Sequence, residues 1–195
     1  VDFTPEPLTQ DVSFVFHIEK TADVVVDSLT AEISGIPSTM ELTTGLILAQ
    51  KTYKLLFRPT YAALPSAADS ASAETLRCEA SVNIPGIVRS HTEDMVTGPG
   101  ILQIAIYTHY DYEEEGTQRK AAKVFHAGIN LYHTLKERKS LQWDEEENGY
   151  RQASRSITVE IGSPLNIDKD GILNGGSTST GLDQWIPGET FEIEV

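Results

Sequence analysis

Hydrophobic and polar residues alternate with a period of two through most of this chain. The clearest run is residues 76–84, where Leu, Cys, Ala, Val and Ile alternate with Arg, Glu, Ser and Asn. Similar runs occupy residues 12–18, 29–33, 53–57, 102–106, 125–131 and 157–161. Successive side chains on a strand point to opposite faces, so each run offers one face to a core and one to solvent. Many short one-sided strands predict an all-β fold, an antiparallel β-sandwich of about seven or more strands.

Only one segment has a helical pattern. In residues 130–139, Leu131 and Leu135 lie four positions apart, as on one face of a helix. The continuous apolar strands and intervening helices of a parallel α/β sheet are missing. We therefore expect at most one short helix.

The connections between the strands have turn and loop composition. Residues 61–75 are rich in Ala and Ser and predict a long surface loop, and residues 89–100 predict a second one. Acidic clusters precede Gly116 and the Asn148-Gly149 pair, which is typical of hairpin tips. No connection has the character of a domain boundary. We expect one domain over residues 9–195, after a linker of residues 1–8 that joins it to a missing N-terminal region.

The last residues predict a terminal strand. After Gly175-Gly176 and a Ser/Thr run come Trp185, a Pro-Gly turn, and then Phe191, Ile193 and Val195 alternating with two glutamates. This pattern predicts a strand with one buried apolar face and one charged face. Such a strand can complete its own sheet or pair with the sheet of another molecule, so these three apolar residues are candidates for an assembly strand. Trp185 is predicted to pack in the core or over a sheet edge.

Charge and cysteine content exclude several classes of protein. The 195 residues carry a formal net charge of −14, which repels phosphate backbones and anionic lipids. We therefore expect no nucleic-acid partner and no membrane contact from this chain. The single cysteine, Cys78, excludes an intrachain disulfide and a multi-cysteine zinc site. No apolar run approaches the roughly 20 residues of a membrane-spanning helix.

The chain lacks the common catalytic motifs. There is no GxSxG elbow, no Gly-rich phosphate loop and no HExxH sequence. Cys78 shares a face with Leu76 and Ala80, so its thiol is predicted to be buried and inert. Acidic residues are too numerous for a carboxylate pair to be singled out for glycoside chemistry. We expect no catalytic residue and no cofactor, and hence not an enzyme.

Metal binding has only weak candidates. Residues 166–177 resemble the first half of a calcium loop, but the twelfth position, which needs a bidentate glutamate, is Ser177. An Asx turn around Asp168 is therefore the better interpretation. The five histidines show neither HxH nor HxxxH spacing, and His126 is predicted to face outward. We expect no metal site.

Aromatic residues offer a possible sugar-binding surface. The candidates are Tyr107, Tyr110 and Tyr112 at the end of one strand, and Trp143 near a hairpin tip. Structural packing is the favoured interpretation of these aromatic residues. Trp143, beside an acidic run, is the candidate for a glycan contact.

The order of these segments resembles a known family. The relevant stretches are residues 29–45 with Ser34, Gly35 and Gly45, KVFHAGINLYHTLK at 123–136, the strand at 157–161, and the closing Gly175-Gly176 with Trp185. Together they resemble the C-terminal domain of the fimbrillin-like surface lipoproteins of the Bacteroidetes-type (type V) pilus system. The resemblance spans most of residues 10–195.

This resemblance implies a transthyretin-like Greek-key sandwich and export by a lipoprotein route to the outer membrane and cell surface. It also implies a structural or adhesive role as a pilus anchor or accessory subunit, with other pilus or surface subunits or host ligands as partners. The lipidated cysteine of the family is not in this chain, because Cys78 lies mid-strand. The alternatives are a carbohydrate-binding module of an outer-membrane lipoprotein and, third, an accessory domain of a glycan hydrolase.

Overall fold

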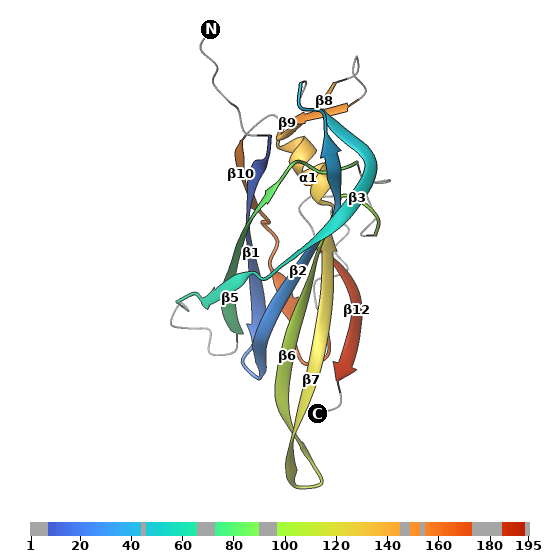
Figure 1. Cartoon of the computed structure of the whole chain (residues 1–195). Helices are drawn as coiled ribbons and strands as arrows, with labels where there is room; N and C mark the ends of the chain where they lie inside the picture. Colours follow the sequence, from blue (N-terminus) through green and yellow to red (C-terminus); the bar gives the residue numbers. More distant parts are fainter. Residues whose placement is uncertain are drawn as a thin grey trace.

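The computed structural model describes residues 8–43, 46–65, 73–89, 97–144, 149–152, 155–172 and 185–193, with the backbone alone at 47–50, 141–144, 149–152 and 193. In these ranges the chain forms twelve strands and one short helix. The strands build two sheets that pack face to face (Figure 1). The prediction of an all-β sandwich with one short helix is confirmed.

The smaller sheet has five strands arranged around β1 (Gln10–Thr21). On one side, β1 pairs antiparallel along its whole length with β5 (Ala73–Ile84). On its other side lie two short parallel strands, β10 (Ser156–Glu160) and β11 (Leu165–Ile167). The far side of β5 pairs with β4 (Thr60–Ala63). The strand with the clearest alternation, β5, therefore lies next to the central strand β1.

The larger sheet has seven strands in the order β12-β7-β6-β2-β3-β9-β8, and all neighbours are antiparallel. Its strands are β2 (Val24–Met40), β3 (Ile47–Phe57), β6 (Leu102–Glu114), β7 (Thr117–Ile129), β8 (Leu141–Asp144), β9 (Gly149–Gln152) and β12 (Ile186–Ile193).

The hairpin of β6 and β7 projects beyond the rest of the sandwich (Figure 1). Its strands stay paired up to Glu114 and Thr117. Glu115 and Gly116 form the two-residue tip, with φ values of 52° and 76°. Positive φ at both positions is typical of the turn that matches strand twist, and glycine adopts it without strain. The hairpin tip predicted at Gly116 is confirmed.

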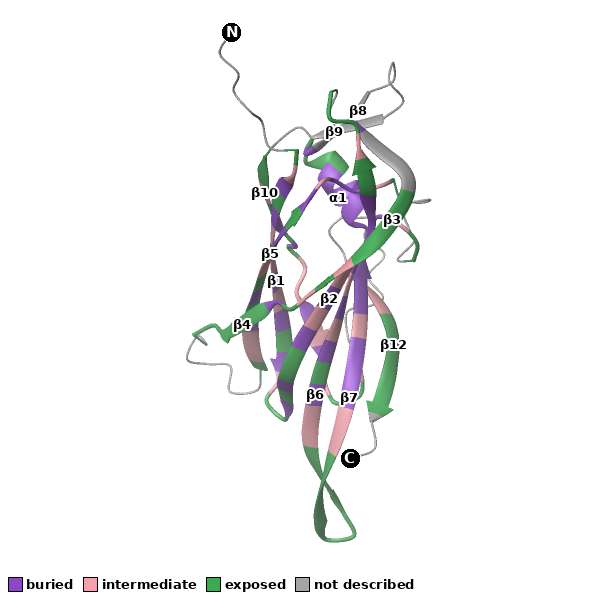
Figure 2. Ribbon diagram, in the orientation of Figure 1, coloured by how far each residue is buried: buried purple, intermediate pink, exposed green. Residues whose placement is uncertain are grey.

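The core lies between the sheets and follows the alternation of the sequence (Figure 2). Val12, Phe14, Phe16 and Ile18 of β1 are each at most 1% exposed. Trp185, just before β12, packs edge-on against Phe16 with ring centroids 5.4 Å apart. The predicted packing role of Trp185 is confirmed.

One end of the sandwich is covered by helix α1 (Leu131–Glu137) (Figure 1). The side chain of Asn130 caps it by accepting a hydrogen bond from the N–H of His133 at 3.3 Å. Residues 131–135 are all buried. The sequence placed Leu131 on a strand, but β7 ends at Ile129 and Leu131 opens the helix. The N-cap at Asn130 explains this boundary.

The prediction of a loop over residues 61–75 is wrong at both of its ends. Thr60–Ala63 forms β4, and residues 73–75 already belong to β5. The chain leaves β3 of the larger sheet at Phe57, passes through Arg58 and Pro59, and enters the smaller sheet as β4. Proline cannot continue a ladder of backbone hydrogen bonds, which fits a change of sheet at this point. A strand of only four residues carries too little alternation to be recognised.

Ser34 and Gly35 form a bulge in β2. The register between β2 and β3 shifts between Ile33 and Ile36. Gly35 has a φ of +76°, and a Cβ there would lie 2.5 Å from the backbone nitrogen of Gly100. Only glycine fits this close approach.

Candidate functional site

The smaller sheet has an edge that is only half covered. β4 pairs with β5 from Leu76 to Glu79. Beyond Glu79, no strand within the described residues pairs with this side of β5, although β1 continues to pair with its other side as far as Ile84. Among the described residues, this side of residues 80–84 is therefore an unpaired row of backbone donors and acceptors. Such a row is a template for an added strand.

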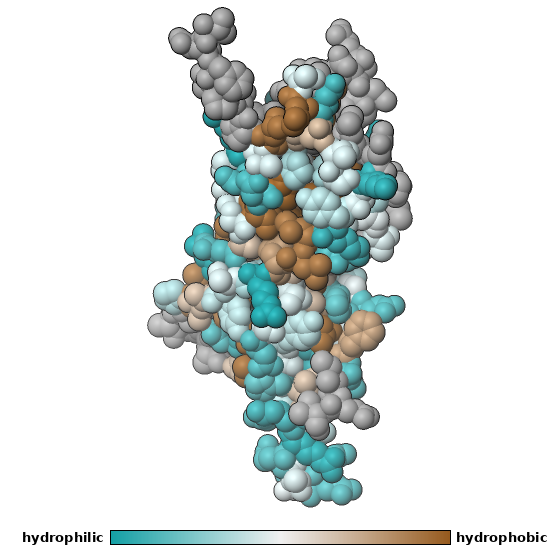
Figure 3. Space-filling model, in the orientation of Figure 1, coloured by the Kyte–Doolittle hydropathy of each residue, from teal (hydrophilic) through white to brown (hydrophobic). Residues whose placement is uncertain are grey.

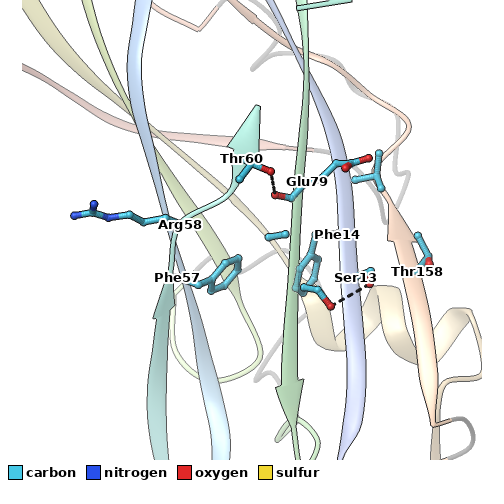
Figure 4. Close-up of a pocket in the computed structure, with 10 residues that line it drawn as sticks. Ser13, Phe14, Phe57, Arg58, Thr60, Glu79 and Thr158 are labelled. Atoms are coloured by element: carbon cyan, nitrogen blue, oxygen red, sulfur yellow. Dashed lines mark hydrogen bonds between the residues drawn. The ribbon is translucent and has the colours of Figure 1, made fainter. Parts of the chain in front are cut away.

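A cleft of about 520 Å³ lies beside this edge, where β3 crosses into β4 (Figure 4). Its apolar part contains Phe14 and Phe57, whose rings stack with centroids 5.9 Å apart and an interplanar angle of 18°. The full lining is Ser13, Phe14, Val15, Phe57, Arg58, Thr60, Glu79, Ala80, Ser81 and Thr158. The cleft thus combines an aromatic floor with a hydroxyl-rich rim.

The rim residues mostly bond to one another. The hydroxyls of Ser13 and Ser81 lie 3.2 Å apart, and Thr60 donates to the carbonyl of Glu79 at 3.4 Å. The carboxylate of Glu79 pairs with Arg77 at 2.5 Å. Figure 4 shows Arg58 pointing away from the cleft. Glu79 is the only carboxylate among the described lining residues, so these do not provide the two facing carboxylates of glycoside hydrolysis.

Hydrophobic surface gathers on the face of the molecule that carries this edge. Figure 3 shows it as a strip that runs between β5 and β3. Met40, Leu55, Phe57 and Ala80 are only partly buried although they pack against the core. Of these four residues only Ala80 belongs to β5, whose next two inward residues, Val82 and Ile84, are buried.

The predicted assembly strand occupies an edge of the larger sheet. β12 pairs antiparallel with β7, with Phe191 opposite Val124 and Ile193 opposite Ala122. Phe191 is 51% exposed, so its predicted burial is wrong. Val195 lies outside the described residues.

The register explains why Phe191 is exposed. Glu192 lies opposite Lys123, and Lys123 shares the inner face of β7 with Phe125. Adjacent residues point to opposite faces, so the inner position of Glu192 places Phe191 on the outer face. The outer ring of Phe191 contacts the ring of His126 edge-on at 5.6 Å. His126 therefore faces outward, as predicted.

Lys123 connects β12 with two other parts of the chain. Its ammonium donates to the carbonyl of Lys169 at 2.7 Å and lies 3.3 Å from a carboxylate oxygen of Glu192. It also lies 5.5 Å from the ring centroid of Tyr110. A buried ammonium needs such partners. By alternation Lys123 shares the face of Phe125, but a charged residue at the end of the apolar run was not predicted to be buried.

The remaining aromatic candidates are dispersed. Tyr110 and Tyr112 share one face of the projecting hairpin, with ring centroids 6.2 Å apart, whereas Tyr107 faces the other way. The backbone of Trp143 lies in β8, opposite Tyr150, at the far edge of the larger sheet. The side chain of Trp143 is outside the described part of the structure. In the described part of the structure, only Tyr110 and Tyr112 of the four candidates lie close to each other.

Cys78 and Asp168 have the predicted environments. Cys78 is fully buried, and burial raises the pKa of its thiol to about 12. Asp168 Oδ1 accepts hydrogen bonds from the N–H groups of Asp170 at 2.7 Å and Gly171 at 2.8 Å, which is an Asx turn. Ser177 lies outside the described residues. Among those described, no group of three or more His, Cys, Asp or Glu residues is placed to hold a metal ion.

In the described part of the chain, no helix has the length and hydrophobicity needed to cross a membrane. Comparisons with protein-family models, with curated proteins and with solved structures found no match to this chain.

Proposed function

We propose that this chain is a non-enzymatic structural or adhesive domain of the cell surface that acts by pairing its β-sheets with those of other proteins. The observation that carries the proposal is the open edge of β5 at residues 80–84, beside the aromatic cleft. An added strand gains main-chain hydrogen bonds along such an edge, and its alternate side chains enter the neighbouring apolar cleft. Phe14 and Phe57 form the floor that would receive them.

The resemblance to fimbrillin-like lipoproteins suggests the type of assembly in which this domain takes part. Within it, the chain is a domain of a pilus anchor or accessory subunit, with a transthyretin-like Greek-key topology, exported as a lipoprotein to the outer membrane. Its partners are other pilus or surface subunits. The edge strand β12 is the element that supplies a strand to a neighbour, and it does so by leaving β7 or by pairing along its own outer edge.

Site-specific photo-crosslinking tests the proposal directly. A benzophenone amino acid at Ser81, on the open half of β5, is expected to form adducts with a neighbouring subunit when the protein is assembled on cells. The matched control carries the same group at Glu19, an exposed residue on the outer face of the central strand β1. Adducts at position 81 alone support pairing along this edge. No adduct at position 81, or equal adducts at both positions, would refute it.

A further inference from the structure

The inner face of β3 carries a row of apolar side chains that is not fully covered. Tyr53, Leu55 and Phe57 alternate along β3 and lie opposite three buried residues of β2, so they point towards the smaller sheet. Tyr53 is nevertheless 45% exposed, and Leu55 and Phe57 are only partly buried. In the described part of the structure, the smaller sheet therefore leaves an apolar surface open between β5 and β3 (Figure 3).

The hydrogen bonds between β4 and β5 show which backbone groups of β5 face this opening. The N–H of Leu64, just after β4, donates to the carbonyl of Thr75 at 2.8 Å, on the β4 side of β5. Backbone groups two residues apart point to the same side of a strand. The N–H and C=O groups of Ser81 and Asn83 therefore point to the side that has no partner strand among the described residues.

The aromatic cleft lies at the fork where β4 separates from β5. β4 begins at Thr60, opposite Glu79, and the residues before it lead back to β3. The next inward residue of β5 is Ala80, which lies opposite Phe14 in β1 and is half-buried. Ala80, Phe14 and Phe57 all line the cleft of about 520 Å³. Because the side chain of alanine is small, the cleft has room for a large apolar side chain of a partner.

Two crossings of the chain bound the opening between β5 and β3 (Figure 1). At one end, residues 57–60 pass from the larger sheet to the smaller one. At the other end the chain returns after Ile84, and the N–H of Val88 donates to the carbonyl of Gly35 in β2 at 2.8 Å. The wide sheet edge of a second folded copy would collide with these crossings, whereas a single extended segment lies between them. The opening therefore favours a short segment over a second copy.

We propose that this opening receives a short extended segment of a partner protein, with a large apolar side chain opposite Ala80. The segment pairs with the backbone of Ser81 and Asn83, and this side chain enters the aromatic cleft. The inserted side chain is uncharged, because Arg58 points away from the cleft and Glu79 is already paired (Figure 4). Ala80 is then the residue that determines specificity. This inference rests on the function proposed above and names the chemistry of the partner segment.

Fluorescence anisotropy with labelled heptapeptides and the intact chain tests the partner chemistry. The probe alternates threonine with apolar residues in the order Thr-Val-Thr-Phe-Thr-Val-Thr. The control peptide has the same composition in the order Thr-Thr-Val-Phe-Val-Thr-Thr. We expect the alternating peptide to bind at least about tenfold more tightly than the control. Replacing its phenylalanine with alanine is expected to weaken binding by about the same factor, because the cleft is then left empty.

Two positions of β5 test the site itself. Ser81→Pro removes an N–H that points to the unpaired side, where proline is tolerated, and is expected to weaken peptide binding at least about tenfold. Ser81→Ala is the matched control, because it also loses the hydroxyl contact with Ser13 but keeps the N–H, and its affinity should stay within about twofold of the wild type. Ala80→Leu fills the cleft and should abolish the preference for phenylalanine over alanine in the peptide. Circular dichroism of each variant checks that the fold is intact.

The proposal is overturned if the alternating peptide does not bind, if both peptides bind equally, if Ser81→Pro keeps full affinity, or if Ala80→Leu still prefers phenylalanine. Any of these results together with adducts from position 81 on cells leaves the proposed function standing and rejects the segment and its inserted side chain. Peptide binding as expected without adducts at position 81 rejects the cell-surface function alone.

Discussion

Phe191 lies directly opposite Val124 on the outer face of the larger sheet. Val124 is only 6% exposed, although it belongs to the outer row of β7, and Tyr107 of β6 flanks it on the other side. The last strand is therefore held by a small apolar cluster outside the main core. The glutamate that follows Phe191 lies on the inner face, opposite Lys123.

Removing the aromatic ring of Phe191 is expected to weaken the packing of β12 on the larger sheet. We predict that Phe191→Ser lowers the free energy of unfolding by about 1 kcal/mol, because it removes the apolar contact with Val124 and the edge contact with His126. Urea denaturation measures this change. The control is Leu56→Ser at a residue that is 70% exposed, where the change should stay below about 0.5 kcal/mol. Equal effects of both substitutions would show that Phe191 does not anchor the strand.

The inner contact is tested at Lys123. Lys123→Met keeps an unbranched stem but removes the donor to the Lys169 carbonyl, so we expect a loss of about 1–2 kcal/mol in unfolding free energy. Amide hydrogen exchange should become faster over residues 186–193, because the link to Glu192 is also lost. Lys120→Met, an exposed position of the same strand, is the control. Unchanged exchange in β12 would mean that Lys123 does not hold it.

The close approach of the Gly100 backbone to Gly35 can be tested by comparing alanine substitutions at three glycines. Gly35→Ala is expected to destabilise by about 1–3 kcal/mol or more, because both its φ of +76° and the approach of Gly100 oppose a Cβ. Gly116→Ala shares the φ but meets nothing within 4 Å, so about 1 kcal/mol is expected. Gly162→Ala has no neighbour within 4 Å and no positive φ, and should be nearly neutral. Thermal or urea unfolding ranks the three, and another order would contradict the close approach.

The buried thiol predicts a pH dependence of stability. Burial raises the pKa of Cys78 from 9.0 to about 12, so above pH 9 the unfolded chain loses the thiol proton while the folded chain keeps it. The stability that comes from keeping the Cys78 thiol protonated is fully present below pH 9 and is lost as the pH rises from 9 towards about 12. The wild type should lose about 1.4 kcal/mol per pH unit more than Cys78→Ala between these values.

Urea denaturation at pH 8 and above, in steps of about half a pH unit, measures both slopes. Thiol labelling at pH 8 gives a second measurement: native protein should react only after denaturant is added. Parallel slopes for the two proteins, or rapid labelling of the native thiol, would show that Cys78 is accessible.

Much of the fold could be predicted from local patterns. The alternation in residues 12–18 and 76–84 identified two core strands, because a period of two separates the two faces of any strand. Gly116 marked a hairpin tip, and the four-residue spacing of Leu131 and Leu135 marked the helix. These are local properties of the chain, and each depends on a few neighbouring residues.

The candidate sites could not be predicted in the same way. Alternation shows which residues share a face, but it does not show which face meets the core, and a shift of one residue reverses the answer. In FEIEV, pairing with β7 placed Glu192 on the face of Lys123 and Phe191 on the outer face, and both side chains are exposed. The apolar residues were expected on the buried face.

By itself, then, the sequence determined strands with two distinct faces, their turns and one helix, because these depend on local sterics and hydrophobicity. Only the tertiary structure decided which strands are neighbours. It ended β4 after four residues, so that among the described residues one side of residues 80–84 has no partner strand beside Phe14 and Phe57. Strand order and register arise from contacts between distant residues, which no local pattern records.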